Sequence, residues 1–109
     1  MSNKPPDVGD ATFEDEVIKA KVPVLVDFWA PWCAPCHIVS PVVEEIAEAM
    51  EDQIKVCKVN VDENPIIAQG YAIRAIPTLI LFSGGREAAR MVGVRPRESI
   101  EKEIRAAIK

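Results

Sequence analysis

The sequence predicts an α/β fold with a central mixed β-sheet of four to five strands and four helices that flank both of its faces. Helical and strand patterns alternate along most of the chain, which is typical of parallel strands joined by crossover helices. Two strand patterns are almost continuously apolar, so both faces of these strands are expected to be covered. A Gly-Gly turn late in the chain joins two further strand patterns as an antiparallel hairpin, which makes the sheet mixed.

Size and composition agree with a single domain over residues 1–109. The chain has 109 residues, of which 49% are apolar, and this is enough for one core. The net charge of −4 and the absence of a basic face argue against nucleic acid as a partner. No apolar run approaches the ~18–20 residues of a membrane span, and the N-terminus lacks the apolar stretch of a signal peptide. We therefore expect a cytoplasmic monomer that binds neither nucleic acid nor membranes.

The first regular element is expected to be a helix that follows an irregular or weak-strand lead-in over residues 1–9. A Pro-Pro pair disfavours a regular strand there, because proline lacks the N–H that a strand ladder needs. Asp10 and Thr12 are candidate caps of the helix, which should end near Lys21. Three apolar residues are expected on its inner face: Phe13, Val17 and Ile18.

A buried strand, a long helix and a second buried strand follow. The first strand covers residues 24–29, and only Asp27 interrupts its apolar run. The helix covers residues 33–50, with apolar residues at helical spacing. It contains Pro41, which removes one backbone hydrogen bond. Residues 54–61 form the second buried strand, expected to run parallel to the first.

The remaining elements are a short helix, a hairpin and a final helix. The short helix begins at Asn64-Pro65, a cap residue followed by a proline in the first turn. Residues 78–82 form a third strand, and residues 87–92 return as its antiparallel partner after the Gly-Gly turn. Pro96 opens the last helix, whose apolar face has an isoleucine at every fourth position: Ile100, Ile104 and Ile108.

Cys33 and Cys36 stand where the first buried strand ends and the long helix begins. Unpaired N–H groups of the first helical turn, together with the helix dipole, favour a thiolate on Cys33. A thiol with a lowered pKa is a nucleophile. Cys36 follows on the same face of the helix, which brings the two sulfurs within bonding reach. The pair is therefore predicted to be a redox dithiol, with the more buried Cys36 as the resolving thiol.

Three other interpretations of these cysteines stay open. The string Cys-Ala-Pro-Cys-His spells the attachment motif of c-type haem, although the long apolar helix that follows leaves little room for a haem. Four residues have the right chemistry for zinc: Cys33, Cys36, His37 and Cys57. However, two of these are adjacent, and Cys57 is expected to face away. The domain could also be a docking subunit whose cysteines are idle.

Asp27 is the predicted proton acceptor of the dithiol. It interrupts an apolar strand, so it is expected to be buried, and burial raises the pKa of a carboxyl group toward neutrality. Such a group can take up the proton that Cys36 must lose before it attacks.

Taken together, these motifs resemble the thioredoxin family over nearly the whole chain, from about Ala11 to the end. A CxxC directly after a buried strand, with Ile-Pro-Thr about forty residues later, is a specific combination. The matching residues are Asp27-Phe28-Trp29-Ala30, Trp32-Cys33-Ala34-Pro35-Cys36, Pro41, Lys58, Asn60, Asp62, Ile76-Pro77-Thr78, Gly85 and Gly93. The resemblance implies the thioredoxin fold and a protein-disulfide reductase that maintains cell redox homeostasis by dithiol–disulfide exchange.

The resemblance also implies roles for residues outside the cysteine motif. Lys58 would lie near Asp27, and the two would offset each other's burial; the alternative is a purely structural ion pair. Pro77 would be cis and would shape a bare backbone edge for a target strand, although an ordinary trans proline opening an edge strand also fits the sequence. The residues expected to surround the cysteines or contact the target are Trp32, Ala34, Pro35, Ala75, Ile76, Pro77, Val92, Gly93 and Val94.

Three residues near the cysteines depart from the family pattern. Ala34 stands where glycine is usual, and its higher helix propensity is expected to shift the redox balance. His37 replaces a common lysine; its charge would modulate Cys33, or it is an exposed residue of little effect. Ala75 replaces a glycine, and its methyl group is expected to reduce the range of target proteins that can bind. Cys57 has no family role and is expected to be a buried, inert thiol.

The implied partners supply and receive electrons. No cofactor and no metal ion are expected in this chain. By resemblance, a thioredoxin reductase returns the chain to its dithiol form, and this reductase is either NADPH-dependent and flavin-containing or ferredoxin-linked. The other partners are target proteins that contain disulfides.

Overall fold

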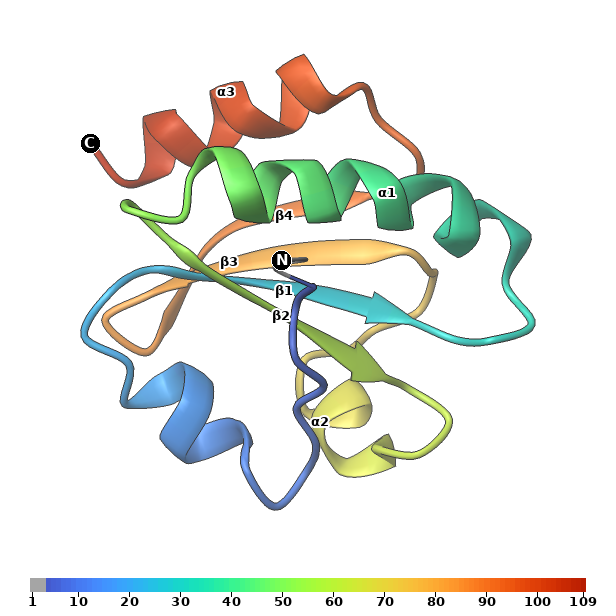
Figure 1. Cartoon of the computed structure of the whole chain (residues 1–109). Helices are drawn as coiled ribbons and strands as arrows, with labels where there is room; N and C mark the ends of the chain where they lie inside the picture. Colours follow the sequence, from blue (N-terminus) through green and yellow to red (C-terminus); the bar gives the residue numbers. More distant parts are fainter. Residues whose placement is uncertain (1–3) are drawn as a thin grey trace.

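A four-stranded mixed sheet forms the centre of the computed structural model, which describes residues 4–109 (Figure 1). The strands are β1 (Val24–Trp29), β2 (Lys55–Asn60), β3 (Thr78–Ser83) and β4 (Arg86–Val92). Their order across the sheet is β2-β1-β3-β4. β1 runs parallel to β2, whereas β3 is antiparallel to both β1 and β4. The predicted mixed sheet is confirmed, with the first buried strand at its centre.

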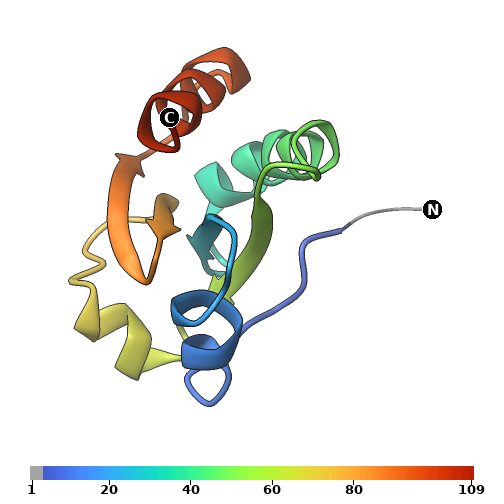
Figure 2. The ribbon, with the colours of Figure 1, turned by 90° about the vertical axis from the view of Figure 1, so that its left-hand side faces the viewer.

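Helices cover both faces of this sheet, as predicted (Figures 1 and 2). α1 (Ala34–Ala49) and α3 (Arg97–Ala107) lie on one face. The five-residue π-helix η1 (Glu14–Ile18) and α2 (Pro65–Gly70) lie on the other. The fold is therefore the three-layer arrangement that the thioredoxin-like pattern implied.

The core is divided by the sheet into two apolar clusters. Successive side chains of a strand point to opposite faces. Leu25 of β1 therefore packs with buried residues of α1 and α3, whereas Val24, Val26 and Phe28 pack with residues from the η1 side. By the same alternation, Asp27 points to the face that α1 covers. The strand pattern thus places a carboxyl group beneath the helix that carries the cysteines.

The lead-in contacts β2 without forming a regular strand. The Val8 N–H donates to the Lys58 carbonyl at 2.8 Å, and the Lys58 N–H donates to the Pro6 carbonyl at 2.9 Å. Asp7 and Lys58 form an isolated parallel bridge. The expected irregular or weak-strand lead-in is found over residues 4–9, and residues 1–3 lie outside the described part of the chain.

The first helix is shorter than predicted, and its expected caps are wrong. It ends at Ile18 rather than near Lys21, and no side chain caps its start. The hydroxyl of Thr12 accepts a hydrogen bond from the N–H of Gly9 at 3.1 Å, so it stabilises a local turn. Its expected inner face is correct, because Phe13 and Val17 are buried and Ile18 packs against the same cluster.

Asp10 caps α2 instead of the first helix. Its carboxylate accepts hydrogen bonds from the N–H groups of Ile67 at 2.9 Å and Ile66 at 3.3 Å. The expected cap residue, Asn64, makes no capping bond; its side-chain oxygen accepts from the Asp10 N–H at 2.8 Å. Asp10 and Asn64 are far apart in the sequence, so local spacing could not predict this arrangement.

Candidate active site

Cys33 and Cys36 form a disulfide at the N-terminus of α1. Cys33 is the N-cap residue with extended backbone (φ −91°, ψ 105°), and Cys36 lies in the first turn, with a Cα–Cα distance of 5.3 Å between them. The Cys36 N–H donates a hydrogen bond to the Cys33 sulfur at 3.2 Å. In the reduced protein this N–H and the helix dipole would stabilise negative charge on that sulfur.

Both cysteines are nearly buried in a small apolar cluster with Ala30. Cys33 is 4% exposed and Cys36 is 2% exposed. Trp29, Val61 and Ile76 are partly buried residues packed against this cluster. Cys36 is slightly more buried than Cys33, as predicted for the resolving thiol. A target must therefore approach closely to reach the sulfur atoms.

The segment before β3 lies against the disulfide. The Ile76–Pro77 peptide bond is cis, as the resemblance implied. The Cys33 sulfur lies 3.7 Å from the carbonyl oxygen of Ile76. The Pro77 carbonyl accepts a hydrogen bond from the Gly93 N–H at 2.9 Å, and the Ala75 carbonyl accepts one from the Thr78 hydroxyl at 2.5 Å. These bonds hold the segment in place beside the cysteines.

Exposed apolar side chains are found among the predicted ring residues. Trp32 is 70% exposed, and Val92 and Val94 are about half exposed. The indole N–H of Trp32 donates to a carboxylate oxygen of Asp62 at 2.8 Å, so the ring is held although it faces solvent. Ala34, Pro35 and Ala75 are also exposed. Exposed apolar groups that are fixed in place are typical of a surface that binds other proteins.

Asp27 is the buried carboxyl group near the site. It is 1% exposed, and neither of its oxygens has a hydrogen-bond partner within residues 4–109. Burial raises the pKa of Asp27 from 3.8 to about 6, and the charge of Lys58 partly opposes this increase. A carboxyl group in this range can exchange a proton near neutral pH.

Lys58 lies opposite Asp27 on the neighbouring strand but makes no ion pair with it among the described residues. Its ammonium group donates to the hydroxyl of Ser40 at 3.2 Å. It also lies 4.5 Å from the centre of the Trp29 ring, a cation–π distance. The expected pairing of Lys58 with Asp27 is therefore electrostatic and not a direct contact. Sequence reasoning missed Ser40, because a serine within a helix carries no pattern of its own.

His37 faces the loop that precedes the disulfide. Its Nε2 atom lies 2.7 Å from the carbonyl oxygen of Pro31, and its ring is 6.3 Å from that of Trp29 in an edge-on arrangement. The residue thus connects the first turn of α1 to the β1–α1 loop. Its expected effect on Cys33 stays a prediction.

Cys57 lies in the apolar cluster on the η1 side of the sheet, where it is fully buried. Burial raises the pKa of this thiol to about 12. The four residues considered as zinc ligands are therefore not brought together. Within residues 4–109 no group of three His, Cys, Asp or Glu side chains is placed so that it could hold a metal ion.

The helices described over the same residues are all too short or too polar to span a membrane.

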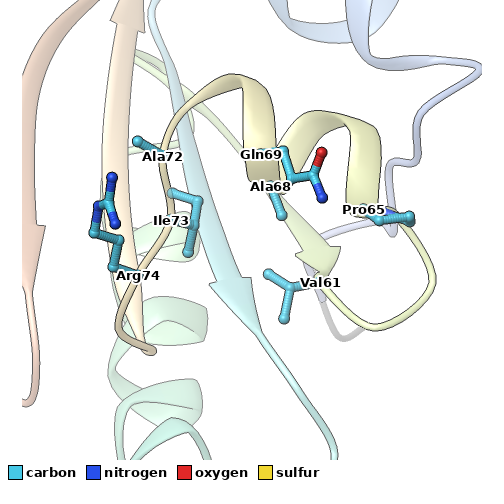
Figure 3. A pocket seen from close by; sticks show the side chains of 7 residues that line it. All are labelled: Val61, Pro65, Ala68, Gln69, Ala72, Ile73 and Arg74. Atoms are coloured by element: carbon cyan, nitrogen blue, oxygen red, sulfur yellow. The ribbon is translucent and has the colours of Figure 1, made fainter.

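A pocket of about 420 Å³ lies between β2, α2 and the segment before β3 (Figure 3). Its lining residues are Val61, Pro65, Ala68, Gln69, Ala72, Ile73 and Arg74. One of the lining residues, Val61, also packs against the cysteine cluster. All of the lining residues lie in one stretch of the chain, residues 61–74, yet the sequence pattern did not predict the pocket, because its shape depends on how this stretch folds in space.

Comparison with known proteins agrees with this geometry. Residues 5–106 match the sequence model of the family described as Thioredoxin. The chain is 55% identical over 93 residues to thioredoxin 1 of Synechococcus elongatus, covering 85% of this chain and 87% of that protein. It is 50% identical over 95 residues to a thioredoxin of Alicyclobacillus acidocaldarius, covering 87% and 90% of the two chains. It is 47% identical over 97 residues to the chloroplastic M-type thioredoxin of Chlamydomonas reinhardtii, covering 89% and 69%.

Proposed function

The chain belongs to the thioredoxin family, and on this premise we propose that Cys33 is the nucleophile, Cys36 the resolving thiol and Asp27 the proton acceptor of its reaction. The protein is a protein-disulfide oxidoreductase that acts by dithiol–disulfide exchange. The observation that supports these roles best is the Cys33–Cys36 disulfide at a helix N-terminus, beside the cis peptide before Pro77.

In the first exchange, the Cys33 thiolate attacks one sulfur of a target disulfide. A bond forms between Cys33 and that sulfur while the target disulfide breaks, and the second target sulfur leaves as a thiolate. The N–H of Cys36, which donates to the Cys33 sulfur, favours the thiolate needed for this step. The product is a mixed disulfide between the two proteins.

In the second exchange, Cys36 gives its proton to the carboxylate of Asp27 and attacks the Cys33 sulfur. The Cys33–Cys36 disulfide forms, the bond to the target breaks, and the target leaves with both of its sulfurs reduced. Two electrons thus pass from the dithiol to the target. The raised pKa of Asp27, about 6, makes the carboxyl group suitable for this transfer.

The target would bind as an extended segment along residues 75–77. The exposed side chains of Trp32, Val92 and Val94 offer apolar contacts around it. The pocket beside Val61 would accept an apolar side chain that flanks the target disulfide. The methyl group of Ala75, which a glycine would lack, is proposed to limit which segments fit.

The partners follow from this cycle. A thioredoxin reductase is proposed to return the disulfide to the dithiol, and disulfide-containing proteins are the proposed targets. The proposed setting is the cytoplasm, where disulfides are continually reduced, with the protein acting as a monomer that carries no cofactor. Nucleic acids and membranes are not proposed as partners, since the net charge is −4.

Reduction of insulin by dithiothreitol, followed as turbidity, tests the proposal. We expect the wild-type chain to accelerate the reaction and Cys33→Ser to have no catalytic effect. Equal rates for the two proteins would show that the cysteines are idle and would favour a docking subunit. A measured reduction potential well above that of a reductase would instead indicate an oxidase or isomerase.

A further inference from the structure

The side chain of Lys58 has two polar groups within its reach on the α1 face of the sheet. Lys58 and Asp27 are register partners on adjacent strands, which lie about 4.8 Å apart, so their side chains point to the same face. The ammonium group nevertheless donates to the Ser40 hydroxyl at 3.2 Å, and neither oxygen of Asp27 has a hydrogen-bond partner in the part of the chain that the structure describes. Ser40 thus holds a cation that would otherwise be available to the carboxylate.

Within the sheet, Asp27 has one charged and one apolar register partner. β2 contributes Lys58, whereas the register partner from β3 is the apolar Leu79. On the α1 side, Ser40 binds the ammonium group of Lys58, and His37 lies edge-on to the Trp29 ring that this ammonium group also contacts. Burial is the main cause of the raised pKa of Asp27, and the charge of Lys58 opposes it.

A lysine ammonium group is a mobile donor on a flexible stem. A hydrogen bond to a carboxylate is stronger than one to a neutral hydroxyl, and more so away from water. If the Ser40 hydroxyl were absent, the ammonium group of Lys58 could turn to the carboxylate of Asp27 and form a stronger hydrogen bond there. A direct contact would then favour the ionised form of this carboxyl group.

We propose that Ser40 is a positioning residue for the resolving step: by binding the ammonium group of Lys58, it keeps that cation off Asp27 and so keeps the carboxyl group able to take up and release a proton. This inference rests on the proposed role of Asp27. α1 would thus contribute two residues to the resolving step: Cys36, and Ser40 one helical turn later.

The test measures the pKa of Asp27 from the carbon-13 signal of its carboxyl group in the oxidised protein, assigned with Asp27→Asn. The disulfide form is chosen because its cysteines do not titrate. In Ser40→Ala we expect the pKa of Asp27 to fall by about one unit, the size expected when an opposite charge moves into direct contact with a carboxyl group. An unchanged or increased pKa would overturn the proposal.

A double-mutant cycle shows whether the effect passes through the lysine. In a Lys58→Gln background, Ser40→Ala should leave the pKa of Asp27 unchanged, because no ammonium group can be released. The same decrease in both backgrounds would overturn the proposal. Ser40→Thr, which keeps the hydroxyl, should retain the wild-type value.

The pH dependence of the reaction rate distinguishes the role of Ser40 from the proposed role of Asp27 as proton acceptor. We start from the reduced protein and measure how the rate of mixed-disulfide resolution depends on pH. In Ser40→Ala, the acid limb of this profile should move to lower pH by the same amount as the pKa of Asp27. A shift in the pKa with an unmoved rate profile would support the positioning of Lys58 by Ser40 while removing Asp27 from the mechanism.

Discussion

The sulfur of Cys33 lies 3.7 Å from the carbonyl oxygen of Ile76, across the narrow gap between the first turn of α1 and the segment before β3. These two residues are 43 positions apart in the sequence. A target sulfur bonded to Cys33 would place the target backbone directly against residues 75–77. The chemistry and the binding of the target therefore take place on one small surface.

Removal of the resolving thiol should trap this arrangement. Cys36→Ser is expected to form a stable mixed disulfide through Cys33 with a target protein, because the second exchange needs the Cys36 sulfur. Non-reducing electrophoresis followed by mass spectrometry would identify the linked cysteine. Cys33→Ser is the matched control and should form no such complex. A link through Cys57 in Cys36→Ser, or a complex through Cys36 in Cys33→Ser, would contradict the assigned nucleophile.

Asp27 should make the stability of the oxidised protein depend on pH. Its pKa in the folded state is about 6 compared with 3.8 ordinarily, so between these values the folded state holds a proton that the unfolded state has lost. Stability therefore falls as the pH rises through this window and is lowest above it. Asp27→Asn, which mimics the neutral carboxyl group, should be more stable than the wild type above pH ~7, by up to about 3 kcal/mol.

This difference between Asp27→Asn and the wild type should disappear below pH ~4, where the carboxyl group is protonated in both states. Urea unfolding of the oxidised proteins across this pH range provides the measurement. A constant difference at every pH would mean that packing and not charge causes the effect.

The hydrogen bond between Trp32 and Asp62 should matter for target binding but not for folding. The indole is 70% exposed and its N–H donates to Asp62 at 2.8 Å. Asp62→Ala is expected to lower kcat/KM for insulin reduction about 2- to 5-fold, since an exposed bond of this kind contributes ~0.5–1 kcal/mol. The melting temperature should stay unchanged. Glu63→Ala, which removes the adjacent exposed carboxylate, is the control, and equal effects of both changes would refute a role for the Trp32 contact.

Asp10 should stabilise the fold through α2. Because its carboxylate accepts from the N–H groups of Ile66 and Ile67, Asp10→Ala is expected to cost about 1–2 kcal/mol in denaturant unfolding. Thr12→Ala, which removes only a local turn contact, should cost about 0.5 kcal/mol or less. A larger loss of stability in Thr12→Ala than in Asp10→Ala would instead favour Thr12 as a cap of the first helix, as the sequence suggested.

The sequence predicted what depends on local pattern. The apolar run of residues 24–29 made β1 a central strand, the spacing of residues 33–50 matched α1 to within one residue at each end, and the Gly-Gly turn predicted the β3–β4 hairpin. The position of the CxxC at a helix start also indicated the redox pair. Each of these features follows from side-chain periodicity or from the needs of one backbone turn.

Contacts between distant segments were decided only by the tertiary structure. Asp10 caps α2 because the lead-in passes over the start of that helix. Lys58 binds Ser40 and not Asp27, although strand register places the two charges side by side. A side chain with several partners within reach takes the one that packing presents to it, and the order of residues along the chain does not contain that choice.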